Sequence, residues 1–253
     1  DFKAPFPEEF NRQITSKIAK WHFAPTKLSK KNLLSEGVKR SLITITGNTE
    51  IDSLYWVLNK IDNDENRQKK LKKVLNNYLL FNWQKEKFIL ITAHRRENFG
   101  DGFFQICFAL KELALKYPKV HFIYPVHLNP KVSGIVYKTL QEFKNVHLIK
   151  PLEYELFVYL LKHSYLILTD SGGIQEEAPS LGKPVLVMRD LTERPEAVEA
   201  GTVEVIGSNQ QKIIERVSFL LNNKKYYQTM AKANNPYGDG DACKHILDIL
   251  RSI

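Results

Sequence analysis

The sequence has little cysteine and no long apolar run. Only two of its 253 residues are cysteine, and Cys107 and Cys243 lie far apart and outside any C-x-x-C pair. Neither a disulfide framework nor a zinc ribbon is indicated, which favours a reducing compartment. No stretch reaches the roughly 18 to 20 apolar residues of a membrane-spanning helix, and no charged-then-apolar signal pattern opens the chain. We therefore expect a soluble, cytoplasmic protein with no membrane partner.

Common catalytic and metal-binding signatures are also missing. The sequence has no G-x-S-x-G elbow, no Walker A run, no H-E-x-x-H helix and no Cys/His cluster with metal-ligand spacing. We therefore expect no metal and no cofactor. Its only methionines are Met188 and Met230, so Asp1 is not a natural start and the chain is interpreted as the later part of a longer one. Residues 1–7 are expected to form a loop that runs into a helix.

Positive charge exceeds negative charge: 37 Lys and Arg against 28 Asp and Glu give a formal net charge of +9. This balance suits a nucleic acid, an acidic membrane surface or an anionic small molecule. The densest cluster, at residues 67–73, precedes apolar residues at helical spacing, which favours a solvated helix face. Because no RNA-binding aromatic motif, zinc finger or basic zipper accompanies it, we expect no nucleic-acid partner.

Apolar strands alternate with amphipathic helices from residue 87 to residue 221. Strands are predicted at 88–92, 120–124, 146–149, 165–169 and 184–187, and helices at 103–117, 131–143, 154–163, 174–181 and 210–221. This order is typical of an α/β domain with a doubly wound parallel sheet covered on both faces. Ligands of such sheets bind beyond the carboxyl ends of the strands, so the loops there are candidate sites.

The first 61 residues show a similar but shorter pattern. Helices are predicted at 8–20, up to Gly37 and at 51–61, and strands at 22–24 and 41–46. This segment resembles the tail of another α/β unit. The polar stretch at 62–68 is the best candidate for a boundary or hinge.

The segment that follows the predicted strand at 165–169 is the most informative. The strand stops at Ser171-Gly172-Gly173 and a helix begins, which leaves backbone N–H groups unpaired beside the positive end of the helix dipole. Such a turn suits phosphate, and the Ser171 hydroxyl can donate to a phosphate oxygen. Glu177, one helical turn further, could accept from two ribose hydroxyls. The alternative is a tight strand-to-helix turn with a Ser or Asp cap; the two adjacent glutamates favour a nucleotide.

Cationic side chains follow the predicted strand at 88–92. His94, Arg95 and Arg96 come together at its carboxyl end, and such a group forms an anion site in which the histidine can contact a diphosphate. A lone histidine there would more often be structural. The two arginines beside it favour the anion site.

Three further loops carry weaker signals. His127 lies in a loop bracketed by prolines, where a structural role is the better interpretation. Arg194 faces several carboxylates, so an ion pair and an anion-binding role are equally plausible. Phe157 could pack on a base, although core packing is favoured.

Taken together, these residues resemble the non-hydrolysing UDP-N-acetylglucosamine 2-epimerases of bacteria. The matching motifs occur in the family's order along nearly the whole chain: residues 7–12, 45–49, 94–100, 125–130, 169–182, 193–196 and 235–240. The resemblance implies the two-domain, glycosyltransferase-B-like fold of nucleotide-sugar enzymes, with UDP against a Rossmann-like C-terminal domain. The implied domains are the remainder of an N-terminal Rossmann-like domain (1–50), hinge helices (51–86), the UDP-binding domain (87–230) and a C-terminal helical segment (231–253).

The family interconverts UDP-N-acetylglucosamine (UDP-GlcNAc) and UDP-N-acetylmannosamine (UDP-ManNAc). UDP is eliminated to give a 2-acetamidoglucal and then added back, with the C2 proton returning to the opposite face. The resemblance therefore implies an isomerase that supplies ManNAc units for polysaccharide biosynthesis, as a homodimer. Departure of a diphosphate needs charge stabilisation, and moving a carbon-bound proton needs a positioned carboxylate.

The resemblance also assigns roles residue by residue. Glu8 matches a carboxylate implicated in proton transfer, and His94 is assigned to catalysis and to UDP. The other positions that match UDP contacts are Phe157, Ser171, Gly172, Gly173, Glu177 and Arg194. In bacterial members a second, activating UDP-GlcNAc contacts residues that match Arg95 and His127.

The match departs from the family in two places. The family has roughly one more α/β half before residues 7–12, which supplies the other catalytic carboxylates, and Leu152 stands where relatives often have a glutamine near the nucleotide. These departures keep two alternatives open: a catalytically inactive UDP-binding remnant, and a glycosyltransferase that uses a UDP-sugar. If the chain is complete as given, it is expected to bind UDP weakly and not to epimerise UDP-GlcNAc.

Overall fold

The computed structural model describes residues 7–252, which form two compact units. The smaller unit combines the chain up to Ser53 with the chain from Pro236 onward, and the larger unit is Leu54–Asn235. Of the loop expected over residues 1–7, all but Pro7 lies outside the described residues. Among the described residues, no helix is both long and apolar enough to cross a membrane.

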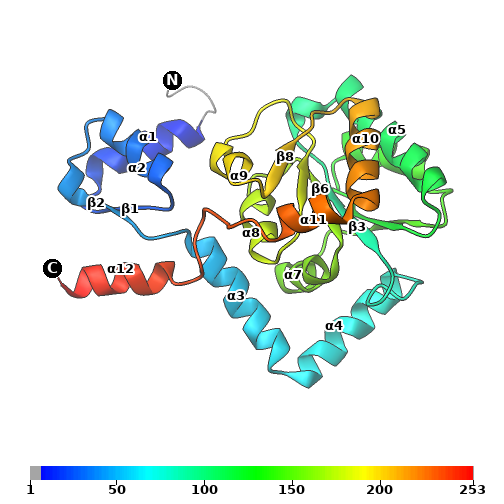
Figure 1. Cartoon of the computed structure of the whole chain (residues 1–253), viewed down its shortest axis with the longest axis horizontal. Coiled ribbons are helices and arrows are strands. Elements are labelled where there is room, and N and C mark those ends of the chain that lie inside the picture. The colour runs from blue at the N-terminus through cyan, green and yellow to red at the C-terminus, as the bar shows by residue number, and fades with distance from the viewer. Residues whose placement is uncertain (1–6, 253) are drawn as a thin grey trace. The chain divides into compact units, whose positions relative to one another are not determined.

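The larger unit is built on a six-stranded, wholly parallel sheet (Figure 1). Its strands lie in the order β5-β4-β3-β6-β7-β8. Their bounds are β3 Phe88–Thr92, β4 His121–Pro125, β5 Val146–Ile149, β6 Leu166–Thr169, β7 Val185–Val187 and β8 Val203–Val205. The strands are short apolar runs because both faces of the sheet are covered, so inward and outward side chains are equally buried.

The strand order reverses between β3 and β6. From β3 the chain builds outward through β4 to β5, and it then returns to β6 and builds the other way through β7 to β8. In the register, Thr92 at the end of β3 lies opposite Thr169 at the end of β6, and their hydroxyls are hydrogen-bonded at 2.5 Å. The loops that leave β3 and β6 therefore open at a topological switch point, where open α/β sheets bind ligands.

Helices cover both faces of this sheet. One core joins the strands to α5 (Asp101–Lys116), α6 (Pro130–Leu140) and α10 (Gln210–Asn222). Another cluster joins α3 (Thr49–Asp62) to α7 (Tyr154–His163). The remaining helices of the unit are α4 Glu65–Tyr78, α8 Ile174–Ser180, α9 Pro195–Glu199, α11 Lys224–Ala231 and the short 3₁₀ turn η2 Arg96–Asn98.

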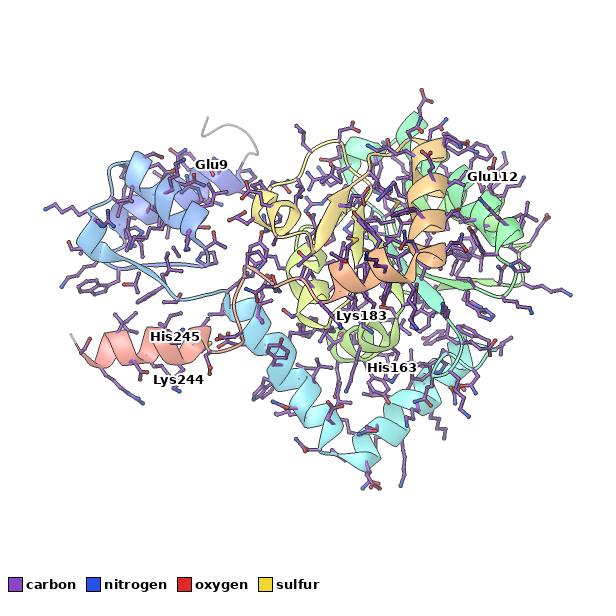
Figure 2. All side chains as sticks on the ribbon, in the orientation of Figure 1. Glu9, Glu112, His163, Lys183, Lys244 and His245 are labelled. Carbon is purple, nitrogen blue, oxygen red and sulfur yellow. The ribbon has the colours of Figure 1, made fainter. Side chains whose placement is uncertain are left out.

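The smaller unit has a two-stranded parallel sheet of β1 (His22–Ala24) and β2 (Ile43–Ile45). Its other elements are α1 Glu8–Ile18, α2 Lys27–Ser35, the 3₁₀ turn η1 Arg40–Leu42 and α12 Ala242–Arg251. Glu9 of α1 (labelled in Figure 2) holds Arg12 at 2.7 Å, and Glu36 holds the same guanidinium at 2.6 Å. These ion pairs join α1 to the C-terminal end of α2.

The C-terminal segment rejoins the smaller unit through backbone contacts. The Asn48 N–H donates to the Tyr237 carbonyl at 2.8 Å. The carboxylate of Asp52 accepts from the N–H groups of Ala242 and Cys243 at 3.1 and 2.7 Å. The last helix therefore belongs with residues 43–53 and is not a separate segment.

The compact units differ from the domains expected from the sequence. The expected hinge at 51–86 falls mostly inside the larger unit, because Leu54 and Leu58 of α3 pack on Val158 of α7. The polar stretch at 62–68 lies inside the larger unit. It holds the end of α3, the turn at 63–64 and the start of α4, which Asp64 caps by accepting from the Arg67 N–H at 2.9 Å. The boundaries fall instead at Ser53 and Pro236.

Candidate functional site

The candidate site lies where β3 and β6 end, at the reversal of strand order. The loop after β3 carries His94 and Arg95, and the loop after β6 carries Asp170 and the turn Ser171-Gly172-Gly173. The sequence predicted both loops as candidate anion sites without predicting that β3 and β6 are neighbours. Their pairing brings the two loops together.

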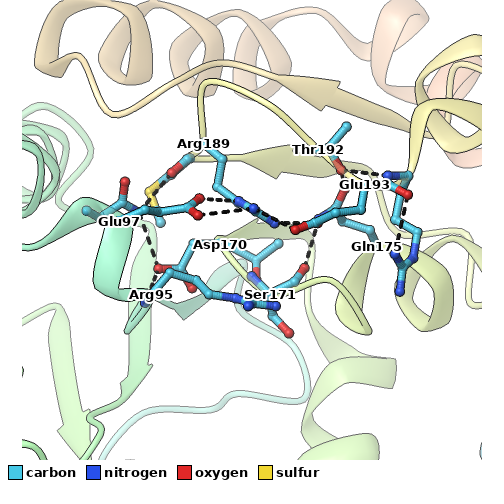
Figure 3. Close-up of polar contacts among 12 residues, drawn as sticks. Arg95, Glu97, Asp170, Ser171, Gln175, Arg189, Thr192 and Glu193 are labelled. Carbon is cyan, nitrogen blue, oxygen red and sulfur yellow. Dashed lines mark hydrogen bonds and ion pairs between the residues drawn. The ribbon is translucent and has the colours of Figure 1, made fainter. Parts of the chain in front are cut away.

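Asp170 ties the two loops to each other (Figure 3). Its side chain is fully buried, and its Oδ2 atom accepts from the backbone N–H groups of His94 and Arg95 at 2.8 and 2.7 Å. The Asn98 amide donates to the same oxygen at 3.3 Å and to the Met188 carbonyl at 3.1 Å. Three donors on one oxygen fix the carboxylate, and through it they fix the start of the histidine loop.

His94 stands at the edge of the site with its side chain 42% exposed. Its ring stacks on that of His127, with centroids 5.1 Å apart and planes 10° from parallel. Burial lowers the pKa of His94, the Asp170 carboxylate opposes this effect, and His127 and Arg95 add to it. His127, predicted to be structural from the residues alone, therefore contacts the histidine at the switch point.

The glycine turn after β6 presents unbonded donors. The N–H of Ser171 donates to Thr169 Oγ1 at 2.9 Å, but within residues 7–252 the N–H groups of Gly172, Gly173 and Ile174 make no hydrogen bond. A Cβ atom on Gly172 would lie 3.7 Å from Nη2 of Arg95 and 3.7 Å from Nη2 of Arg194. Two guanidinium groups thus flank a turn with unbonded backbone donors, which is the arrangement expected of a phosphate or diphosphate site.

Arg194 has an ion pair as well as a place at this turn. Its Nε atom donates to Glu176, whose side chain is only 4% exposed, and its Nη1 atom donates to the Glu193 carbonyl at 3.3 Å. An ion pair and an anion-binding role, both left open for Arg194 by the sequence, are therefore compatible, because the ion pair holds the guanidinium beside Gly172.

A second arginine supports the loop on which Arg194 lies. Arg189, with its side chain 7% exposed, contacts the carboxylates of Glu97 and Glu193 (Figure 3). Its bonds to Glu193 are 2.6 and 2.8 Å long, and they lower the pKa of Glu193 to about 2. This network joins the loop after β7 to the loop after β3.

Glu177 lies on α8 and is 8% exposed. The Tyr154 hydroxyl, at the start of α7, donates to its Oε1 atom at 2.6 Å. Phe157, one turn further along α7, is half-buried. The residues expected at a ribose and a base therefore come from two helices joined by the tyrosine.

Glu8 is the one expected site residue outside the larger unit. It is an exposed residue in the first turn of α1. Among the described residues, no group of three or more His, Cys, Asp or Glu side chains could hold a metal ion.

Three residues of the site were not predicted from the sequence: Asp170, Arg189 and Tyr154. Asp170 and Arg189 each lie just beyond a buried strand, which was the available signal. Their partners lie 76 and 92 residues away, so only the strand order identifies them. For Tyr154, the only sequence feature that could have pointed to the site was its place at the start of a helix.

Comparisons with known proteins identify the family. The family model described as UDP-N-acetylglucosamine 2-epimerase matches residues 1–251. The UDP-N-acetylglucosamine 2-epimerases of Yersinia pestis and Campylobacter jejuni are each 53% identical, over 100% and 97% of this chain and 66% and 64% of their own lengths. The chain thus spans slightly less than two thirds of these relatives.

Solved structures give the same result. The UDP-GlcNAc 2-epimerase of Neisseria meningitidis bound to UDP-GlcNAc superposes with a TM-score of 0.91 at 49% identity, over 100% of this chain and 67% of that one. The Methanocaldococcus jannaschii enzyme in complex with UDP-GlcNAc and UDP gives 0.81 at 33%, over 100% and 66%. The wall teichoic acid polymerase TagF, at 14% identity and a TM-score of 0.58 over 97% and 61%, shares the fold alone. With the family model matching residues 1–251, this chain belongs to the UDP-N-acetylglucosamine 2-epimerase family.

Proposed function

We propose that this protein interconverts UDP-GlcNAc and UDP-ManNAc by eliminating UDP and adding it back. The observation that carries the proposal is the turn after β6, where two guanidinium groups lie 3.7 Å from the Cβ position of Gly172 beside unbonded N–H groups. This arrangement suits the diphosphate of a nucleotide sugar.

The reaction needs a base, a stabilised leaving group and no redox partner. A carboxylate takes the C2 proton, the C2–H electron pair forms the C1–C2 double bond, and the C1–O bond breaks with its electrons going to the β-phosphate oxygen of UDP. Addition reverses these steps, with the proton delivered to the other face of C2. Groups that bind the departing diphosphate more strongly as its charge grows accelerate elimination.

Different residues of the larger unit are assigned to the diphosphate, the ribose and the base. The diphosphate is assigned to the N–H groups and hydroxyl of Ser171-Gly172-Gly173, together with Arg194 and His94. The ribose hydroxyls are assigned to Glu177, and the base to Phe157. The proximity of Arg194 to Gly172 and the hydrogen bond from Tyr154 to Glu177 support these assignments.

Two assignments rest on the family pattern. Glu8 would move a proton at C2. Arg95 and His127 would contact a second, activating UDP-GlcNAc, and the stack of His127 on His94 supports a link between that site and the diphosphate. The protein would act as a cytoplasmic homodimer that supplies ManNAc units for polysaccharide biosynthesis.

The test is proton NMR of the chain with UDP-GlcNAc in deuterium oxide. Deuterium entry at C2 with a UDP-ManNAc signal, and loss of both in His94→Gln, is the expected result. Saturable UDP binding without exchange would instead support the inactive UDP-binding alternative. Consumption of the UDP-sugar only when a sugar acceptor is present would support a glycosyltransferase.

A further inference from the structure

One carboxylate oxygen beside the diphosphate site has no hydrogen-bond donor. Asp170 is fully buried, and its Oδ2 atom takes all three hydrogen bonds that the side chain makes. Its Oδ1 atom is buried without a hydrogen-bond partner among the described residues. A buried carboxylate oxygen left unsatisfied is costly, so it calls for an explanation.

The imidazole of His94 lies close to that oxygen. Its Nδ1 atom lies 4.0 Å from Oδ1, too far for a hydrogen bond. The carboxylate is fixed by its three donors, whereas the imidazole is 42% exposed and makes no hydrogen bond through its ring within the described residues. A charge-assisted bond would need Nδ1 at about 2.8 Å from Oδ1, and the exposed ring has no hydrogen bond that opposes this approach.

Three charged or titratable groups face the His94 ring. Asp170 lies beneath it, His127 stacks on it and Arg95 is its neighbour in the chain. Only Asp170 favours the protonated imidazole. His127 Nδ1 accepts from the Asn129 N–H at 3.1 Å, which fixes the proton of neutral His127 on Nε2.

We propose that Asp170 is a positioning residue for His94: its Oδ1 atom accepts the Nδ1–H of His94 when a nucleoside diphosphate binds, which turns a protonated Nε2 toward the β-phosphate. This inference rests on the proposed function and adds a residue to it. The histidine then carries a positive charge where the departing UDP gains negative charge. Before binding, Nδ1 stands 4.0 Å from Oδ1, and burial lowers the pKa of His94.

The competing explanation is that Asp170 only braces the loop through Oδ2. Asp170→Asn separates the two roles, because an amide keeps one oxygen for the N–H groups of His94 and Arg95 and replaces the other with an NH₂ donor. That donor faces Nδ1 and favours the opposite tautomer of the imidazole. Asn98→Ala is the matched control, since it weakens the same bracing at Oδ2 and leaves Oδ1 intact.

The experiment is an NMR titration of the histidine rings in the 253-residue chain, with the His94 signals assigned from His94→Gln. Asp170→Asn is expected to lower the pKa of His94 by at least about one pH unit, and Asn98→Ala to leave it within about 0.3. At pH 6.5 the UDP dissociation constant should rise at least tenfold in Asp170→Asn, a factor on the order of one lost charge-assisted bond.

The unaltered chain gives a second readout that does not depend on how well Asp170→Asn folds. With saturating UDP, the ¹⁵N shifts of His94 should report a protonated, hydrogen-bonded Nδ1. A proton on Nε2 alone, or an equal His94 pKa in Asp170→Asn and the unaltered chain, would overturn the inference. If UDP does not bind at all, the proposed function fails, and the titration of His94 without nucleotide still decides whether Asp170 controls the ring.

Discussion

Glu177 shows how a side chain beside the site is itself held in place. Its carboxylate is buried except for 8% of its surface, and the Tyr154 hydroxyl bonds to Oε1 at 2.6 Å. A hydrogen bond to a charged group contributes about 1.5–3 kcal/mol when both partners are buried. Because Tyr154 is 42% exposed, this bond contributes less than that range, about 1 kcal/mol, and it mainly restricts the directions in which the carboxylate can point.

We expect Tyr154→Phe to weaken UDP binding by about 1 kcal/mol, roughly fivefold, because the carboxylate loses the donor that orients it toward the ribose. Glu177→Ala should weaken binding by about 1–3 kcal/mol, since both ribose contacts go. Isothermal titration calorimetry with UDP measures both. Tyr137→Phe is the control, as Tyr137 is a 41%-exposed residue on α6. Unchanged affinity in Glu177→Ala would refute the ribose assignment.

Two glycines in the larger unit differ in backbone conformation but both have open space around the Cβ position. Gly100, the N-cap of α5, has φ 91° and ψ −134°, a conformation that is almost confined to glycine. Gly134 lies inside α6 at an ordinary negative φ. A Cβ atom at either position would meet no atom within 4 Å, so neither substitution creates a clash.

Gly100→Ala should therefore lower the free energy of unfolding by about 1–3 kcal/mol, the cost of that backbone conformation for a residue with a side chain. Gly134→Ala should raise it by about 0.5–1 kcal/mol, because alanine is the better helix former. Urea denaturation followed by circular dichroism measures both changes. Equal effects of the two substitutions would show that the φ of Gly100 is not the controlling feature.

A histidine pair joins β4 and β5 at the end of the sheet remote from the site. His121 Nδ1 and His147 Nε2 are 2.9 Å apart, and the ring of Phe81 stacks on both. Burial, with a smaller contribution from His121, lowers the pKa of His147 to about 4. Burial also lowers the pKa of His121, against the raising effect of Glu86.

This pair predicts a loss of stability in mild acid. The unfolded chain binds a proton at His147 near pH 6.5, whereas the folded chain binds it only near pH 4. The contribution of neutral, buried His147 to the free energy of unfolding is therefore fully present above pH 6.5. It is lost as the pH falls from 6.5 to 4, by about 1–3 kcal/mol in all. Urea midpoints measured between pH 7.5 and 4.5 test this. His147→Gln should flatten the dependence; an unchanged slope would assign it to other groups.

Secondary structure was predictable where an apolar run ends abruptly. The strands at 88–92 and 146–149 and the helix at 154–163 are confirmed residue for residue. The sixth strand, β8, was missed because it has three residues with Glu204 in the middle, too few for a period to show. Helices α9 and α11, of five and eight residues, were missed for the same reason.

The candidate site was predictable only in part. His94 and the glycine turn each follow a strand, so their position along the chain identifies them as ligand-facing. The role of Asp170 depends on β3 lying next to β6, a pairing across 76 residues that no local pattern encodes. Likewise, the unit boundary at Pro236 depends on where the chain returns: Asn235 still bonds to Glu176 and Ser180 of the larger unit, at 2.8 and 2.6 Å.

The residues proposed to bind UDP and the residue proposed to move the proton belong to different units. Every residue assigned to UDP lies within Leu54–Asn235, which has its own sheet and core, whereas Glu8 lies in the smaller unit. A group that only moves a proton lowers the barrier to reaction and does not change the affinity for the leaving group. Nucleotide binding and proton transfer should therefore respond to different substitutions.

Glu8→Gln should accordingly leave the UDP dissociation constant within about twofold and slow deuterium entry at C2 of UDP-GlcNAc by at least about 100-fold, the usual contribution of a general base. Glu9→Gln is the matched control. Its carboxylate pairs with Arg12, which lowers the pKa of Glu9 to about 2, so its loss should alter the stability of the smaller unit and leave the exchange rate largely intact. Calorimetry with UDP and the NMR exchange assay on the same samples separate the two effects. Weaker UDP binding in Glu8→Gln, or exchange at the rate of the unaltered chain, would remove Glu8 from proton transfer and shift the search for the base to other carboxylates.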